Sequence, residues 1–148
     1  MNLKLEDKKI GFCITGSFCT FKVILEQLKN IKKEKAKIIP IMSKHSYTLD
    51  SRFGSAKDFI DKVESITEHK IIHTIQEAEA IGPKKMVDIM IIAPCTGNTI
   101  AKLRHGITDT TVTMAAKSHL RNNNSIVIAV STNDGLSRKC REYWGIIK

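Results

Sequence analysis

The sequence lacks any run of about 18 consecutive apolar residues, so a membrane-spanning helix is not expected. Its 148 residues are 42% apolar and 26% charged, which is typical of one globular domain with a single core. The N-terminal segment also lacks an apolar signal core and carries Glu6 and Asp7. A secreted protein is therefore not predicted, and we expect a cytoplasmic location without a membrane partner.

Cysteine-pair and metal motifs are missing as well. None of the four cysteines, Cys13, Cys19, Cys95 and Cys140, forms a C-x-x-C pair. The five histidines show no metal-ligand spacing. We therefore expect free thiols in a reducing compartment and no metal site.

Aromatic residues are scarce, at 5% of the chain, although the formal net charge is +9. The densest basic run, over residues 29–37, has no aromatic side chains interleaved with it to stack on bases. A solvated helix end and turn explains this run better than a nucleic-acid patch does. No nucleic-acid partner is predicted.

The two common nucleotide-binding motifs are absent. Gly11 and Gly16 have the separation of a P-loop, but Ser17 stands where the lysine must be. Only one glycine lies in this turn, so the dinucleotide-binding fingerprint is missing too.

The chain does contain alternating strand and helix patterns. Short apolar runs predict buried strands at 8–15, 36–42, 87–93 and 125–131. Helical spacing predicts helices over 23–31, 55–66, 74–80, from 97 onward, and over 110–120 with Asp109 as its cap. Segment 43–54 is predicted to be a loop, and Pro40 suggests an edge strand or a strand end. The alternation predicts a parallel, doubly wound α/β sheet.

Ligands of such sheets bind beyond the carboxyl ends of the strands, which selects loops 15–19, 43–54, 94–98 and 131–135. The first of these begins Thr15-Gly16-Ser17 and opens a helix. Its glycine and hydroxyl groups would let an anion approach the helix N-terminus. A simple helix cap by Ser17 or Thr20 is an equally good interpretation.

Loop 94–98 is the most informative of the four. Pro94 fixes the exit from a buried strand, and Thr96, Asn98 and Thr99 offer donors and acceptors beside free helix-start amides. A plain cap needs only one such residue, so three of them with a glycine favour a ligand. Asn98 either serves that ligand or merely starts the following helix. Loop 131–135 fits a ligand loop and a solvent turn equally well.

Residues 93–109 read Ala-Pro-x-Thr-x-Asn-Thr-x-Ala-Lys-x-x-x-Gly-x-x-Asp. Together with Thr15-Gly16-Ser17, this motif resembles the flavoprotein superfamily of homo-oligomeric flavin-containing decarboxylases. The resemblance implies a flavodoxin-like three-layer fold, a homo-oligomer and FMN as the cofactor. The residues that it implies for FMN are Thr15, Gly16, Ser17, Ser43, Pro94, Thr96, Asn98, Ser131 and Asn133.

Within this superfamily the chain is similar to the family of dipicolinate synthase B subunits. The segments that carry the similarity include residues 51–54, 82–84, 114–117, 121–123 and 131–134. The similarity implies oxidation of a dihydrodipicolinate-level precursor to dipicolinate in the mother cell of a sporulating bacterium, together with a nicotinamide-binding A subunit. Arg52, Lys84 and Lys117 would then hold the dicarboxylate substrate. The alternatives are a non-catalytic FMN-binding module and, ranked last, a relative of the flavin prenyltransferases or decarboxylases.

Two departures from the family pattern matter. The decarboxylases carry a catalytic histidine seven residues before the aspartate that matches Asp88, where this chain has Ile81, and His73 lies too far upstream to replace it. Decarboxylation is therefore not predicted, and the sequence identifies no catalytic residue. The resemblance stops after Leu136, so we expect a flavoprotein-like domain over 1–136 and a divergent tail over 137–148, without the family's C-terminal strand and helix.

Overall fold

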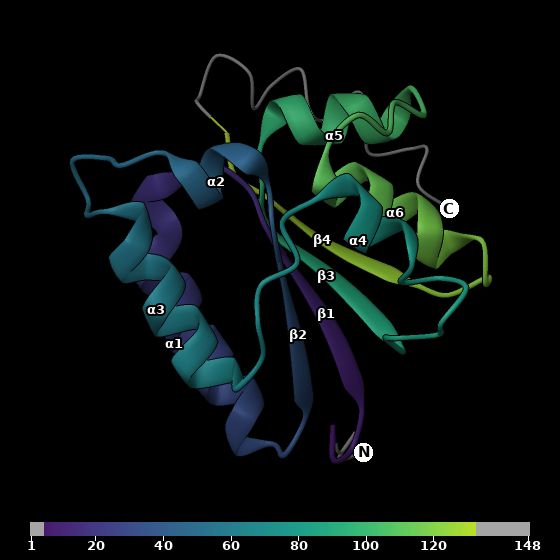
Figure 1. Cartoon of the computed structure of the whole chain (residues 1–148), viewed down its shortest axis with the longest axis horizontal. Coiled ribbons are helices and arrows are strands. Elements are labelled where there is room, and N and C mark those ends of the chain that lie inside the picture. Colours follow the sequence, from purple (N-terminus) through teal and green to yellow (C-terminus); the bar gives the residue numbers. More distant parts are fainter. Residues whose placement is uncertain (1–4, 133–148) are drawn as a thin grey trace.

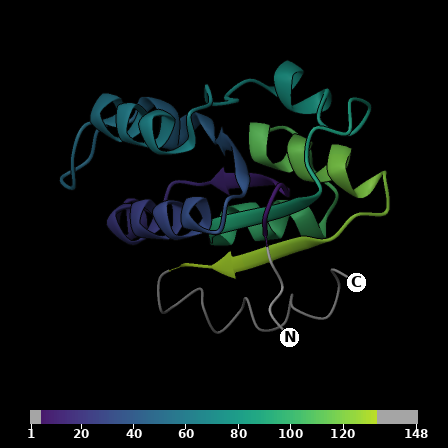
Figure 2. The ribbon, with the colours of Figure 1, turned by 90° about the horizontal axis from the view of Figure 1, so that it is seen from below.

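A computed structural model describes residues 5–132, in which four strands form one parallel sheet. The strands are β1 (Lys9–Ile14), β2 (Lys37–Met42), β3 (Ile89–Cys95) and β4 (Ile126–Val130). Their order in the sheet is β2-β1-β3-β4, and Figure 2 shows β4 at one margin. This is the flavodoxin-like strand order, so the predicted fold class is confirmed.

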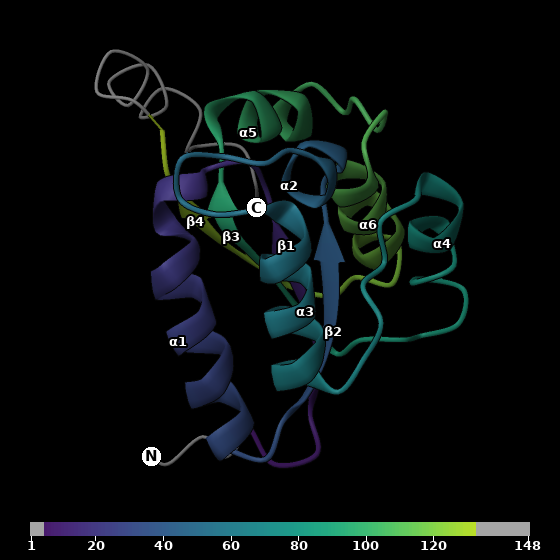
Figure 3. The same ribbon diagram turned by 60° about the vertical axis from the view of Figure 1, so that its left-hand side comes forward.

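The helices cover both faces of this sheet and complete a three-layer arrangement (Figure 1). Helices α1 (Phe21–Lys33) and α3 (Ala56–Thr67) pack on one face, and α4 (Ile75–Glu79) and α6 (Thr111–Leu120) pack on the other. The short helices η1 (Phe18–Thr20) and α2 (Lys44–Thr48) and helix α5 (Gly97–Arg104) follow strand ends. Figure 3 shows α2 and α5 at the end toward which the strands point.

Burial on both faces explains why the central strands lack polar residues. Phe12 and Ile14 of β1 face the cluster formed with α1 and α3, whereas Cys13 faces the cluster formed with α4 and α6. Side chains of a strand alternate between the two faces, so a strand covered on both sides must be apolar throughout. Leu28 anchors α1 and is fully buried.

Two local predictions were wrong. Segment 43–54 is not all loop, because Ser43 caps α2 by accepting a hydrogen bond from the Ser46 amide at 3.3 Å. Asp109 does not cap α6, since Thr110 does so together with Thr113. The Asp109 carboxylate instead pairs with the Lys102 ammonium at 2.8 Å. The Thr110 hydroxyl caps the helix because it accepts a hydrogen bond from the Thr113 amide, the third amide of α6.

Strand β2 lies at the margin of the four-stranded sheet, as Pro40 predicted. A short extended segment runs beside it: the Ile72 amide donates to the Pro40 carbonyl at 2.9 Å, and the Met42 amide donates to the Ile72 carbonyl at 2.9 Å. Because this segment is parallel to β2, the next residue, His73, comes to the same edge as Ser43.

Some predictions fall outside the described residues, namely those for Asn133 and the tail 137–148. Within residues 5–132, no helix is both long and apolar enough to span a bilayer. The same part of the chain contains no group of three His, Cys, Asp or Glu side chains arranged to hold a metal ion.

We expect the stability to depend on pH through His119. This side chain is buried, and its Nε2–H donates to the Ser125 carbonyl at 3.1 Å. Burial lowers the pKa of the imidazole below its ordinary value, so the unfolded chain takes up a proton at a higher pH than the folded one. The free energy of unfolding should therefore fall as the pH drops below about 6.5, by at most about 1.4 kcal/mol per pH unit.

Urea unfolding between about pH 5 and pH 8 measures this effect, with His119→Gln as the matched variant because it keeps a donor but does not titrate. The pKa values of Glu64, Glu77 and Asp109 are held below their ordinary values by hydrogen bonds to Lys70, Thr74 and Lys102, respectively. Their effect on stability therefore appears only in more acidic solution. Parallel stability curves for the two proteins would contradict the prediction.

Candidate functional site

Thr15 joins the first and third predicted loops. Its buried hydroxyl donates to the Pro94 carbonyl and accepts a hydrogen bond from the Thr96 amide at 3.1 Å. The Thr15 amide also donates to the Pro94 carbonyl at 3.3 Å. The buried Thr15 side chain thus joins the two loops. The exposed surface of the site is formed by the neighbouring residues.

Ser17 and Ser131 join the first and fourth loops. Their hydroxyl oxygens lie 3.0 Å apart, and the Ser131 amide donates to the Cys95 carbonyl at 2.9 Å. Neither Ser17 nor Thr20 makes a side-chain cap hydrogen bond to the helix that follows it. The simple-cap interpretation of this loop is therefore wrong.

Gly16 has room for a Cβ atom in ordinary van der Waals contact with its neighbours. A Cβ atom built on it would come no closer than 3.6 Å to another atom, the Cβ of His45. Packing thus does not require a glycine here. The Gly16 amide has no hydrogen-bond acceptor within residues 5–132, so it is available to a ligand.

The second loop is tied to the end of β1. The Ser43 amide donates to the Ile14 carbonyl at 3.0 Å, and the Ser46 hydroxyl donates to the same oxygen at 2.9 Å. These bonds set α2 beside Gly16, as the contact with His45 shows. The described parts of the four predicted loops therefore meet at the carboxyl edge of the sheet.

Asn98 occupies the second position of α5. The cap of this helix is Thr96, whose hydroxyl accepts a hydrogen bond from the Thr99 amide at 3.3 Å, and a cis peptide bond joins Ala93 to Pro94 just before it. The Asn98 side chain is exposed and has no hydrogen-bond partner in the described part of the chain. Capping therefore does not explain an asparagine at this position.

The three predicted substrate residues lie at two different edges. Arg52 is in the turn after α2, with its guanidinium carbon 4.9 Å from the centre of the Phe53 ring. Lys84 lies in the segment that leads into β3, and Lys117 lies in the half of α6 that precedes β4. Strands begin at the edge opposite the four loops, so this chain brings only Arg52 toward the site.

The sequence motifs did not reveal the position of His73. Its ring stacks on Tyr47 with centroids 4.0 Å apart, and its Nδ1 lies 3.9 Å from a Glu77 carboxylate oxygen. In the sequence, His73 lies too far before Asp88 to match the catalytic histidine of the decarboxylases. In the structure, the extended segment beside β2 places His73 at the carboxyl edge of the sheet. The Ile71-Ile72 pair is the sequence signal that could have revealed that segment.

Cys13 and Cys19 are free thiols, as predicted. Cys140 lies beyond the described part of the chain. Burial raises the pKa of the Cys13 thiol, and the nearby Cys95 adds to the effect. Cys13 therefore stays protonated, and it is not a nucleophile.

The architecture defines a class of protein. It is a doubly wound α/β protein whose carboxyl edge presents hydroxyl groups, a glycine and free helix-start amides, which together suit a phosphate-bearing ligand. The Flavoprotein family model matches residues 1–137, and the chain belongs to the Flavoprotein family. The resemblance read from residues 93–109 is thereby confirmed.

Particular relatives agree with this assignment. The chain is 40% identical over 132 residues to the dipicolinate synthase B subunit of Bacillus subtilis (strain 168), covering 89% of this chain and 66% of the relative. It matches the crystal structure of the dipicolinate synthase B subunit from Bacillus halodurans C with a TM-score of 0.82 and 37% identity, covering 96% of this chain and 73% of the other. An FMN-dependent cysteine decarboxylase, SpaF, shares the fold, with a TM-score of 0.75 and 19% identity over 94% of this chain and 79% of the other.

Proposed function

We propose that this chain is the flavin-binding B-type subunit of a dipicolinate synthase. The observation that carries the proposal is the convergence of four loops, joined through Thr15 and the Ser17–Ser131 contact, in a chain 40% identical to such a subunit. The structure of the SpaF relative belongs to an FMN-dependent enzyme, which supports FMN as the flavin. The residues proposed to hold FMN are Thr15, Gly16, Ser17, Ser43, Pro94, Thr96, Asn98, Ser131 and Asn133.

The donor set fits such a cofactor. The Gly16 amide, which has no acceptor within residues 5–132, and the Ser17 hydroxyl suit a phosphate at the start of the η1–α1 region. The exposed Asn98 amide can donate and accept, which suits the polar edge of a flavin ring. Thr15 acts as a positioning residue beneath these groups. When bound, FMN supplies a hydride acceptor.

The proposed reaction is the oxidation of a dihydrodipicolinate-level precursor to dipicolinate during sporulation. Arg52 stands at the same edge as the proposed flavin residues, where a guanidinium can pair with a carboxylate in bidentate fashion. The proposed partner is a nicotinamide-binding A subunit, and the chain is proposed to act as a homo-oligomer in the cytoplasm of the mother cell. The second candidate is an FMN-binding module that supports a catalytic A subunit, and activity of the A subunit alone would favour it.

Titration of the purified full chain with FMN tests the cofactor directly. We expect uptake of one FMN per chain, seen as quenched flavin fluorescence, and weaker uptake of FAD, because no second phosphate or adenine site is predicted. Turnover of a dihydrodipicolinate-level substrate is then expected only when the FMN-loaded chain and the A subunit are combined. A colourless protein that takes up no added FMN would contradict the proposal.

A further inference from the structure

A groove of about 350 Å³ opens next to the proposed flavin loops, between η1, α1, the 49–56 segment and α3. Four phenyl rings line it, those of Phe18, Phe21, Phe53 and Phe59. The Phe21 ring contacts two of the others, with its centroid 5.2 Å from that of Phe18 and 4.1 Å from that of Phe59. Phe18 directly follows Ser17, so the groove begins where the first loop ends.

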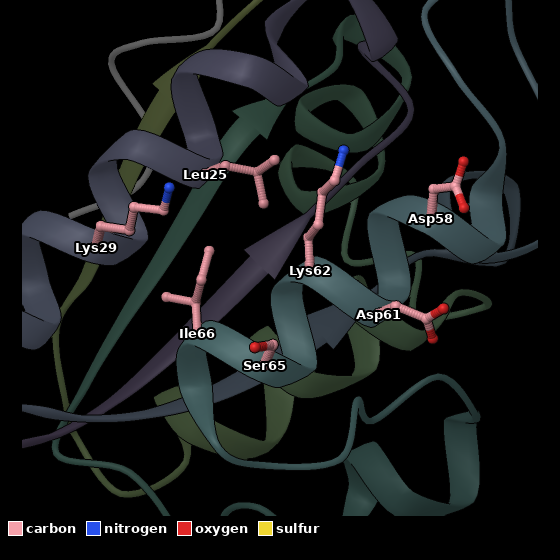
Figure 4. Close-up of a pocket in the computed structure, with 7 residues that line it drawn as sticks. All are labelled: Leu25, Lys29, Asp58, Asp61, Lys62, Ser65 and Ile66. Atoms are coloured by element: carbon pink, nitrogen blue, oxygen red, sulfur yellow. The ribbon is translucent and has the colours of Figure 1, made fainter.

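Two lysines stand on the walls of this groove. Lys22 comes from α1 and Lys62 from α3, and neither has an ion-pair partner within residues 5–132. One acid, Asp58, also lines the groove. Asp58 and Asp61 also line the adjoining cleft of about 500 Å³. Figure 4 shows Lys62 extending toward α1, while the carboxylates of Asp58 and Asp61 point away from α1. Asp61 pairs instead with Lys57 at 2.7 Å.

The groove therefore has an aromatic surface and two available cations in its lining. We propose that it binds a planar ring acid with two carboxylates, whose ring lies against the phenyl surface and whose carboxylates pair with Lys22 and Lys62. Phe53, which carries the Arg52 guanidinium on its ring, lines the same groove and brings a third cation nearby. This assignment rests on the proposed function, in which the groove is the substrate site beside the flavin loops.

Helix packing explains why the sequence pointed to other lysines. Lys84 and Lys117 belong to segments that resemble the B-subunit family, but both lie toward the opposite edge of the sheet. Lys22 and Lys62 are 40 residues apart in the sequence, and they line one groove only because α1 and α3 pack side by side (Figure 3).

Calorimetric titration of the full chain with pyridine-2,6-dicarboxylate tests the groove. The double variant Lys22→Gln/Lys62→Gln should bind about tenfold more weakly or worse, which corresponds to about 1.4 kcal/mol or more. The matched control Lys8→Gln/Lys33→Gln removes the same charge from exposed lysines outside the groove, and it should bind like the parent. Glutarate, which lacks the ring, and pyridine-2-carboxylate, which lacks one carboxylate, should each bind more weakly than the probe.

The groove proposal would be wrong if the parent chain did not bind the probe, or if both double variants lost the same affinity for it. It would also be wrong if glutarate bound as tightly as the probe, or if affinity fell in Lys84→Gln/Lys117→Gln and not in Lys22→Gln/Lys62→Gln. FMN titration of the same proteins separates the two proposals. If the probe binds through Lys22 and Lys62 but the protein takes up no FMN, the groove proposal stands and the flavin function is wrong. If the protein takes up FMN but probe binding does not depend on these lysines, the flavin function stands and the groove proposal is wrong.

Discussion

Replacing Gly82 with alanine should lower the free energy of unfolding by about 3 kcal/mol or more. A Cβ atom at this position would lie 2.1 Å from the Ser118 carbonyl oxygen and 2.8 Å from the Ser118 carbonyl carbon. Both are backbone atoms of α6, so a side-chain rotation cannot relieve the clash. The segment after α4 would have to move away from α6.

That movement would also break a partly buried hydrogen-bond network around Gly82. The Gly82 amide donates to the Ser118 hydroxyl at 2.7 Å, this hydroxyl donates to the Glu79 carbonyl at 2.7 Å, and the Asn122 side-chain amide donates to the Gly82 carbonyl at 2.8 Å. These bonds fix the segment between α4 and β3 onto the end of α6. Losing them would leave the buried Gly82 amide unsatisfied, which adds to the steric cost.

Urea unfolding of three variants separates the two contributions. Ser118→Ala removes the hydroxyl without a clash and should cost about 1–3 kcal/mol. Gly16→Ala places its Cβ no closer than 3.6 Å to any atom and should change the stability little. A Gly82→Ala protein as stable as the parent would show that α4 and α6 are not packed as described.

The second large effect concerns Asn98. We expect Asn98→Asp to weaken FMN binding by about 1–3 kcal/mol, because the variant loses a donor and places a negative charge beside an anionic cofactor. Stability should not fall, since Thr96 caps α5 and Asn98 has no partner within residues 5–132. A carboxylate in the first turn even interacts favourably with the helix dipole.

Thr110→Ala is the contrasting variant for this experiment, because Thr110 is not among the residues proposed to hold FMN. It removes the cap of α6 and should lower the stability by about 0.5–2 kcal/mol. Flavin-fluorescence titrations and melting curves of both variants therefore give opposite patterns, with affinity lost first in one and stability lost first in the other. Equal FMN affinity of Asn98→Asp and the parent would show that Asn98 is not a flavin residue.

The agreement between sequence and structure is best where the pattern is local. The apolar runs of β1 and β3 and the helical spacing of α1 identify their elements, since a strand buried on both faces and an amphipathic helix each leave a characteristic spacing. The errors arose where two residues compete for one role. Asp109 and Thr110 are both good caps, and only the path of the chain decides which side chain reaches the helix.

The sequence by itself determined the order of the elements and the loops at the carboxyl edge, because strand direction and loop position follow from alternation along the chain. Only the tertiary structure decided which side chains meet at that edge. It turned the Thr15 hydroxyl inward, returned His73 to the edge beside Tyr47, and brought Lys22 and Lys62 into one groove. Such contacts depend on how helices pack across the sheet, and residues far apart in the sequence carry no local pattern that records this packing.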